Sequence, residues 1–207
     1  MWVPPAPAVR PPMARRAPRE WPRRAALLAP WLRLAPARAR QADWRQFPPD
    51  FVWGVSTAAF QVEGGLRETG RGPSIWDTFS QQAGNIENGD TAEVACDHLH
   101  RFREDLKLVR QLGAKAYRFS ISWSRVLPTG RLSGGVSEEG LAFYVELCRA
   151  AVAEGLEPVA TLYHWDLPQA LEDEGGWLSP GVVRHFADYA ELCFRALGSY
   201  VRLGGEV

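Results

Sequence analysis

The run Tyr163-His164-Trp165-Asp166-Leu167-Pro168 decides how the fold is interpreted. It follows Pro158-Val159-Ala160-Thr161-Leu162, an apolar segment whose length and composition predict a buried parallel strand. The imidazole of His164, the indole of Trp165 and the carboxylate of Asp166 therefore all lie just after the carboxyl end of a predicted strand. In an α/β barrel those strand ends form the face that binds ligands. An apolar indole beside hydrogen-bonding side chains suits a sugar, whose CH faces stack and whose hydroxyls bond.

The composition is that of a globular protein. Of the 207 residues 46% are hydrophobic, and 24 basic residues balance 24 acidic ones, so no charge excess points to nucleic acid or to anionic lipid. A complete eight-stranded α/β barrel typically needs about 250 residues. Cys96, Cys148 and Cys193 are widely spaced, and we expect three buried free thiols in helices, without disulfides or a metal site.

The first part of the chain, residues 1–43, is rich in Pro, Ala and Arg and shows no sustained helical or strand period. This composition favours a disordered leader. Arg23-Arg24 before a short apolar run also weakly resembles a signal or transit peptide, so the cellular compartment stays open. The apolar run is too short to span a membrane.

From residue 44 onward, strand and helix patterns alternate. The sequence predicts strands at 51–59 (ending near Gln61), 116–121 and 156–162, and helices at 93–112, 138–154 and about 180–197. Ser137 and Ser179 are the expected N-caps of the second and third helices, and Val201 is a candidate start for a fourth strand. Such alternation predicts βαβ units and a parallel sheet, which is an α/β fold.

The third predicted helix has an apolar face that we expect to pack on the sheet. It consists of Val183, Phe186, Tyr189, Ala190, Cys193 and Leu197. No glycine-rich loop with a nucleotide-binding pattern follows any predicted strand, so we expect no cofactor.

Four side chains lie in or just after predicted strands and should gather at one mouth of a barrel: Gln61, Arg118, His164 and Trp165. Gln61 can grip two neighbouring hydroxyls, and Arg118 can hold a carboxylate ionised. Structural alternatives remain open for each residue type. Gln61 could cap a loop instead of binding a ligand. Arg118 could pair with a carboxylate on a helix, and His164 could be a hydrogen-bonded histidine of the core.

Five blocks of this sequence resemble family 1 glycoside hydrolases, the β-glucosidase family. They are residues Phe51 to Gly64, Gly72 to Asp77, Tyr117 to Arg125, Tyr163 to Pro168 and Glu172 to Leu178. The similarity runs from about Trp44 to Arg202. It implies an incomplete (β/α)8 TIM barrel, with about the first three βα units and the start of the fourth strand.

The resemblance also implies a retaining glycosidase that hydrolyses β-glycosides. Gln61, His164 and Trp165 would hold the non-reducing sugar, and Arg118 would contact the nucleophilic carboxylate and keep it charged. Glu63 and Asp166 lie inside the matching motifs, but at positions that are not the family's catalytic acids, so they are expected to be structural. The family pattern implies neither a metal nor a cofactor.

The family's two catalytic carboxylates are not recognisable here. Retaining glycosidases need two carboxyls about 5 to 5.5 Å apart. In this family one lies in an Asn-Glu-Pro motif after the fourth strand and the other after the seventh. Residues 203–207 depart from that pattern, and Glu206 lacks the Asn and Pro neighbours.

We therefore expect a truncated β-glycosidase that is inactive alone. The alternative is a non-catalytic sugar-binding or regulatory fragment that associates with a partner protein. A nucleotide- or metal-dependent barrel enzyme is the least favoured hypothesis.

Overall fold

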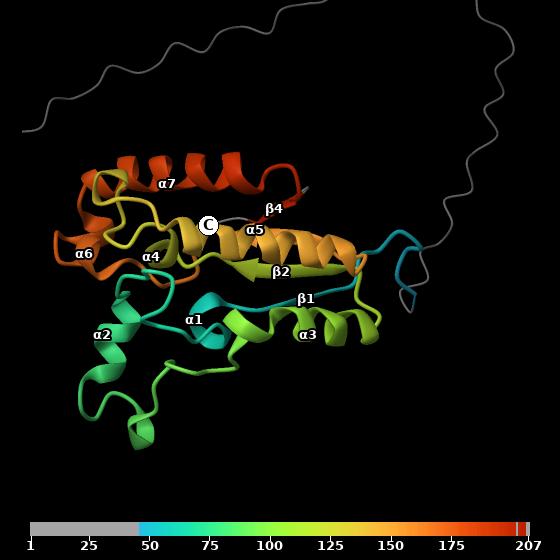
Figure 1. Cartoon of the computed structure of the whole chain (residues 1–207), viewed down its shortest axis with the longest axis horizontal. Coiled ribbons are helices and arrows are strands. Elements are labelled where there is room, and N and C mark those ends of the chain that lie inside the picture. The colour runs from blue at the N-terminus through green and yellow to red at the C-terminus, as the bar shows by residue number, and fades with distance from the viewer. Residues whose placement is uncertain (1–45, 202, 206–207) are drawn as a thin grey trace, which may run out of the picture. The chain divides into compact units, whose positions relative to one another are not determined.

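Across residues 46–201 and 203–205, which are those that the computed structural model describes, the chain builds a four-stranded parallel sheet (Figure 1). The strands are β1 (Gly54–Ser56), β2 (Ala116–Ser120), β3 (Glu157–Thr161) and β4 (Leu203–Gly205), adjacent in chain order. The predicted leader, residues 1–43, lies outside the described residues. The chain from Pro48 onward forms one compact unit.

The register of the sheet places Arg118 beside Ser56 on β1 and Val159 on β3. Because successive side chains of a strand point to opposite faces, Arg118 lies on the face opposite Tyr117 and Phe119. Tyr117 and Phe119 are almost fully buried in the hydrophobic core. The other face of β2 is therefore the one that carries Arg118.

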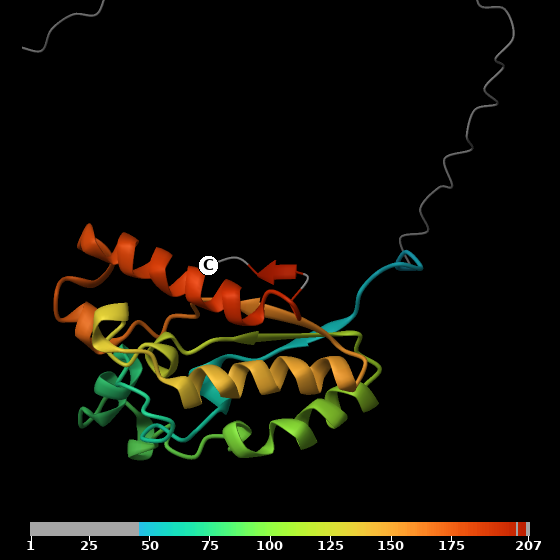
Figure 2. The ribbon, with the colours of Figure 1, turned by 45° about the horizontal axis from the view of Figure 1, so that its top comes forward.

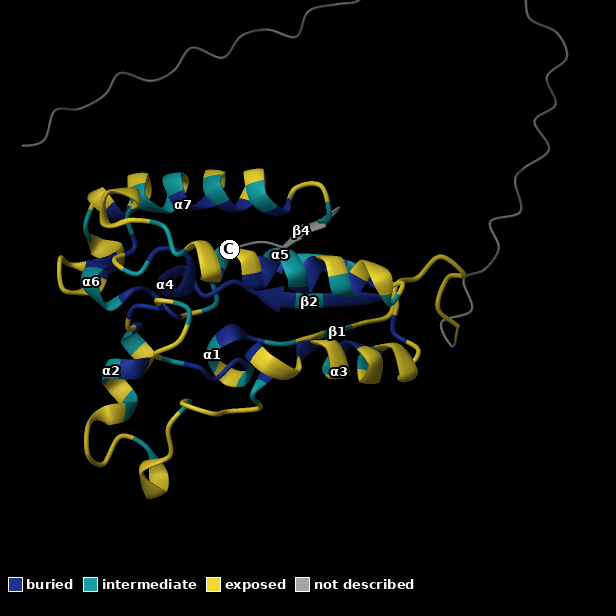
Figure 3. Cartoon of the chain, viewed as in Figure 1, coloured by how far each residue is buried: buried dark blue, intermediate teal, exposed yellow. Residues whose placement is uncertain are grey.

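The long helices α3 (His98–Gln111), α5 (Glu138–Ala153) and α7 (Gly181–Leu197) lie side by side along the sheet (Figure 2). Right-handed crossovers between neighbouring parallel strands put the connecting helices on the same face. Figure 3 shows β2 buried and the outer sides of these helices exposed. Within the described residues, no helix is long and apolar enough to cross a membrane.

Short elements fill the connections that follow the carboxyl ends of the strands. They are α1 (Ala59–Val62), α2 (Ile75–Gln81), η1 (Glu87–Gly89), α4 (Trp123–Val126), η2 (Leu132–Gly134), α6 (Gln169–Glu172) and η3 (Gly176–Leu178). The connection between β1 and α3 is the longest of them, and it carries most of the residues that shape the candidate site.

The structure confirms the second and third predicted strands and the helix that begins after Ser137. The Ser137 hydroxyl accepts a hydrogen bond from the Gly140 N–H at 3.0 Å, as expected of an N-cap. The predicted first strand is too long, because the chain turns into α1 directly after β1 and places Gln61 in a helical turn. The predicted first helix also starts too early: residues 92–96 form turns, and α3 begins at His98.

Three local predictions are wrong. Ser179 does not cap α7, because Pro180 occupies the N-cap position and the Val182 N–H bonds to the main chain of Ser179 instead of to its side chain. Val183 is 69% exposed rather than part of the packed face of α7. Cys96 is exposed because it lies in the turns before α3, whereas Cys148 and Cys193 are buried in helices as predicted.

Candidate functional site

The turn after β1 brings Gln61 to the carboxyl end of the sheet. The Thr57 N–H bonds to the Arg118 carbonyl at 2.9 Å, which extends the pairing of β1 with β2 by one residue. The Ala59 N–H then donates to the Ser120 hydroxyl at 2.7 Å. These two bonds hold the start of α1 against the end of β2, and Gln61 lies on this short helix.

The corner after β3, residues 163–168, presents His164 and Trp165. Trp165 has φ +65°, a left-handed conformation that is rare for residues other than glycine. Trp165 is 73% exposed, whereas the following Asp166 and Leu167 are buried. Tyr189 of α7 donates its hydroxyl to the Leu162 carbonyl at 2.8 Å, which fixes the chain where it enters the corner.

The segment 72–77 supports this corner from outside. The Ile75 N–H bonds to the Leu167 carbonyl, and the Gln169 N–H bonds to the Pro73 carbonyl, both at 2.9 Å. A Cβ at Gly72 would lie 1.9 Å from the Pro128 oxygen, so this close approach requires glycine. The Gly72-Pro73-Ser74-Ile75-Trp76-Asp77 block is therefore a clamp that joins the corner to the loop after α4.

Asp77 orders the start of α2 inside this clamp. Its Oδ2 accepts bonds from the Ser74 N–H at 2.6 Å, from the Ser74 hydroxyl at 2.7 Å and from Arg71 Nη2 at 2.8 Å. The indole of the neighbouring Trp76 stacks on Phe60 with 5.9 Å between ring centroids. Trp76 is thereby held beside α1.

These segments enclose a pocket of about 530 Å³. Its lining combines aromatic, small and polar side chains: Ala58, Phe60, Gln61, Trp76, Ser80, Ile86, Asp90, Thr91, Ala92, Ala95, His164 and Trp165. Gln61, His164 and Trp165 thus meet in one hollow, as the convergence of strand ends predicts. Aromatic faces beside hydrogen-bonding groups can hold a polar ligand that has apolar faces.

Arg118 is not among the described residues that line this pocket. Its Nε donates to the Thr161 hydroxyl at 2.8 Å, which ties β2 to β3. The prediction that all four side chains face one hollow therefore holds for Gln61, His164 and Trp165 and fails for Arg118. Its half-buried guanidinium stays on the face of the sheet opposite the helices.

Sequence reasoning missed several lining residues. Phe60 and Trp76 lie inside blocks that resemble the family, so their motifs were a usable signal. Asp90 and Thr91 come from the loop between α2 and α3, and nothing in the sequence marks that loop as part of the pocket.

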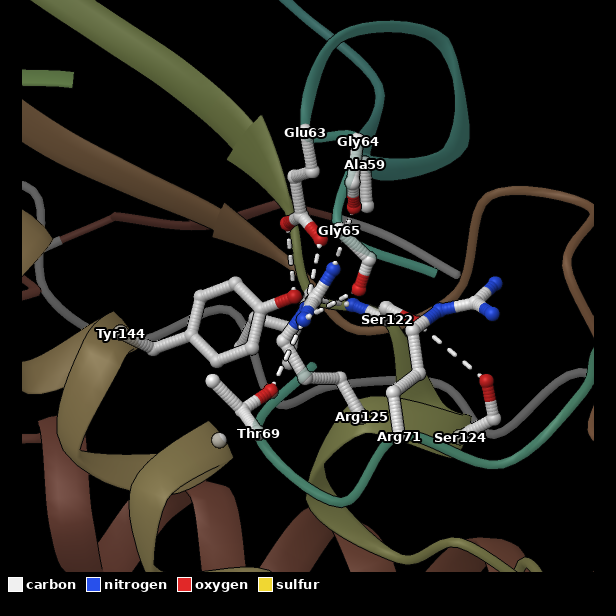
Figure 4. Close-up of polar contacts among 12 residues, drawn as sticks. Ala59, Glu63, Gly64, Gly65, Thr69, Arg71, Ser122, Ser124, Arg125 and Tyr144 are labelled. Atoms are coloured by element: carbon white, nitrogen blue, oxygen red, sulfur yellow. Dashed lines mark hydrogen bonds and ion pairs between the residues drawn. The ribbon is translucent and has the colours of Figure 1, made fainter. Parts of the chain in front are cut away.

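A buried network of polar side chains fixes the segment after β1 (Figure 4). Arg125 Nε donates to Glu63 Oε2 at 2.9 Å, and the Tyr144 hydroxyl donates to Glu63 Oε1 at 2.7 Å. The remaining guanidinium nitrogens bond to the Gly64 carbonyl at 2.9 Å and to the Thr69 hydroxyl at 2.8 Å. Both oxygens of Glu63 therefore have strong partners.

The charges in this network support one another. Burial by itself lowers the pKa of Arg125, but the Glu63 carboxylate beside it makes the net shift upward. Burial, together with the same carboxylate, raises the pKa of Tyr144 well above its usual value. The buried Glu63 carboxylate is therefore paired with the Arg125 cation and hydrogen-bonded by the Tyr144 hydroxyl. A buried ion pair is stable only when its charges are satisfied in this way.

Asp166 is the second buried carboxyl near the site, and it differs from Glu63. Burial first, and the negative charge of Glu63 second, raise the pKa of Asp166 from 3.8 to about 7. Neither carboxyl lines the pocket. In the part of the chain that the structure describes, no group of three or more His, Cys, Asp or Glu residues could hold a metal ion.

The model of glycosyl hydrolase family 1 matches residues 43–204. The chain belongs to glycoside hydrolase family 1. It is 54% identical over 158 residues to a raucaffricine-O-β-D-glucosidase of Rauvolfia serpentina and 50% identical over 155 residues to β-glucosidase A of Acetivibrio thermocellus. These alignments cover 75% of this chain but 29% and 34% of the two relatives.

Solved structures of family 1 β-glucosidases have the same fold over this region. A rice β-glucosidase in a covalent complex with Glc matches with a TM-score of 0.74 and 50% identity, over 76% of this chain and 33% of that one. A Thermotoga maritima β-glucosidase in complex with castanospermine matches with a TM-score of 0.75 and 45% identity, over 78% and 37%.

The chain therefore spans about a third of the length of the relatives that it matches. Its parallel strands and alternating helices correspond to that part of the family 1 TIM barrel. The prediction of an incomplete barrel of this family is confirmed.

Proposed function

We propose that this chain carries the sugar-holding part of a β-glucosidase-type site and that a polypeptide of residues 1–207 binds a glucose-like ligand without hydrolysing a glycoside. The observation that carries this proposal is the pocket that Gln61, His164 and Trp165 line together. The family membership gives the pocket its ligand class, because the similar Thermotoga maritima enzyme was solved with castanospermine.

Each side chain has a distinct proposed role. The amide of Gln61 offers both a donor and an acceptor to neighbouring hydroxyls, and the imidazole of His164 binds a further hydroxyl. The exposed indole of Trp165 lines an apolar face of the sugar. Arg118 is proposed to contact the nucleophilic carboxylate of a complete site, and its bond to Thr161 keeps its guanidinium at the carboxyl half of the sheet.

The proposed lack of hydrolysis follows from chemistry. Retention of configuration needs one carboxylate to attack the anomeric carbon and one carboxylic acid to protonate the leaving oxygen. Glu63 and Asp166 cannot take these roles, because both are buried away from the pocket lining and Glu63 is bonded to Arg125. Asp90 is the one carboxyl among the described lining residues, whereas the mechanism needs two.

Calorimetric titration of the purified chain with castanospermine tests the binding. Castanospermine should bind, and Gln61→Ala should weaken the affinity roughly tenfold, because polar contacts to the ligand are lost. Gln111→Ala at the exposed end of α3 is the matched control and should leave the affinity unchanged. Absence of binding, or equal effects of the two substitutions, would overturn the proposed site.

An aryl β-glucoside tests the second half of the proposal. Release of the aryl group by the purified 207-residue chain should not exceed the uncatalysed rate. Measurable turnover that disappears in the Gln61→Ala variant would show that the chain has its own catalytic carboxylates.

A further inference from the structure

Asp166 is a buried carboxyl directly beside the proposed sugar contacts His164 and Trp165. Asp166 as a whole residue is only 1% exposed to solvent. Within the described residues, Oδ2 has no hydrogen-bond partner, and Oδ1 accepts a long bond from the His164 N–H at 3.4 Å. Hydrogen bonding from the main chain of His164 and of Asp166 itself favours the ionised form, but burial outweighs it. A carboxylate placed in this way is poorly stabilised, since a buried charge needs a partner.

The charged groups around Asp166 do not supply that partner. Glu63 raises the energy of the ionised form, and Arg71 lowers it. Arg71 is bonded to Asp77 at 2.8 Å, so its charge is already balanced. Tyr163 and Tyr189, whose pKa values are raised first by burial and in smaller part by the charge of Asp166, are neutral near pH 7.

The neighbouring backbone is held in an unfavourable conformation. The left-handed φ of +65° at Trp165 persists only where the surroundings enforce it. Leu167 and Asp166 anchor the corner from inside, and the 72–77 clamp anchors it from outside. A new charge on Asp166 would act at the inner anchor, one residue from the strained position.

We propose that Asp166 is a positioning residue whose neutral carboxyl holds the His164–Trp165 corner in its sugar-binding arrangement, and that ionisation of Asp166 releases the corner. This inference rests on the proposed sugar site. Since the pKa of Asp166 is raised to about 7, the transition falls close to neutral pH. The sugar site is then complete on the acidic side and weakened on the alkaline side.

Titration with glucose, which does not itself ionise in this range, tests the effect on binding. If only the protonated form binds, the affinity should fall roughly 30-fold between pH 5.5 and 8.5. Asp166→Asn, a neutral carboxamide of the same shape, should keep the low-pH affinity throughout. Asp173→Asn, at the exposed C-cap of α6, is the matched control and should behave like the wild type.

A second measurement separates this inference from the proposed function. The indole N–H signal of Trp165, assigned by Trp165→Phe, should show a transition near neutral pH in the sugar-free chain and none in Asp166→Asn. If glucose does not bind but the indole titrates, the sugar site is wrong and the positioning role stands. If the wild-type indole signal does not change with pH, or if Asp166→Asn keeps the transition, the positioning role is wrong.

Discussion

Glu63 and Asp166 are two buried carboxyls that follow β1 and β3 of the same sheet, and their surroundings differ. Glu63 receives Arg125 on one oxygen and Tyr144 on the other. Asp166 is hydrogen-bonded by the main chain, with a long bond of 3.4 Å from the His164 N–H, and forms no ion pair among the described residues. The segment after β1 is therefore fixed by a saturated ion pair, while the corner after β3 depends on a carboxyl that is stable when neutral.

The two carboxyls therefore differ in how they respond to pH. A buried ion pair resists change because the loss of either partner leaves an uncompensated charge. A buried carboxyl without a cation responds to pH instead. The first arrangement lies two residues after Gln61, and the second directly follows His164 and Trp165.

The largest expected effect comes from removal of the cation at the saturated site. Arg125→Ala leaves Glu63 buried without its partner and frees the carbonyl of Gly64, so the free energy of unfolding should fall by about 3–5 kcal/mol. Urea denaturation followed by tryptophan fluorescence measures this change.

The exposed pair Arg101–Glu104 on α3 offers the control for this substitution. Arg101→Ala should change the free energy of unfolding by about 0–1 kcal/mol. A similar small effect of Arg125→Ala would show that the Glu63 network does not support the segment after β1.

The second prediction concerns the pH dependence of stability. Asp166 has a pKa of 3.8 in its reference state and about 7 when folded, so between these values the folded chain keeps a proton that the unfolded chain releases. Its contribution is fully present below pH 4 and is lost as the pH rises to 7, by up to about 4 kcal/mol. Urea denaturation at a series of pH values should show a smaller decrease for Asp166→Asn than for the wild type.

Asp173→Asn should retain the wild-type pH dependence, because Asp173 is exposed. Parallel stability curves for the wild type and Asp166→Asn would contradict the contrast between the two buried carboxyls.

Tyr144→Phe should have an intermediate effect at the saturated site. It removes the donor to Glu63 and the acceptor of the Ser122 N–H at 2.8 Å, so stability should fall by about 1–3 kcal/mol. Thermal unfolding followed by circular dichroism suffices to detect it. An unchanged melting temperature would indicate that water replaces both bonds.

The smallest effect is expected at a helix cap. Ser137→Ala removes the acceptor for the Gly140 N–H and a donor to the Thr69 carbonyl, and should cost about 1 kcal/mol. Ser179→Ala should cost less, since the Ser179 side chain does not cap α7. Equal losses in urea denaturation would contradict this assignment of the caps.

Local patterns in the sequence predicted the elements that depend on local forces. Strand β3 lies in the largely apolar segment 158–162, and α5 has both a cap and a regular apolar face, so their positions were readable. The first strand was not, because the small residues between Gly54 and Ala59 suit a strand and a tight turn equally. The bond from Ala59 to Ser120 decides between them, and this partner is 61 residues away.

The candidate site was likewise predictable only where motifs and strand order determine it. Motifs identified Gln61, His164 and Trp165, whose convergence follows from the parallel order of the strands. The position of Arg118 outside the pocket depends on its bond to Thr161, and the pairing of Glu63 with Arg125 spans 62 residues. Neither leaves a local signal in the sequence.

The most direct test of the sugar site is an NMR titration of the ¹⁵N-labelled chain with castanospermine, read at the indole N–H signals. Trp165 and Trp76 line the pocket and should shift until the site is saturated, while Trp53, at the amino end of β1, should not move. Shifts of Trp53 alone, or no saturable shift of Trp165, would contradict the account.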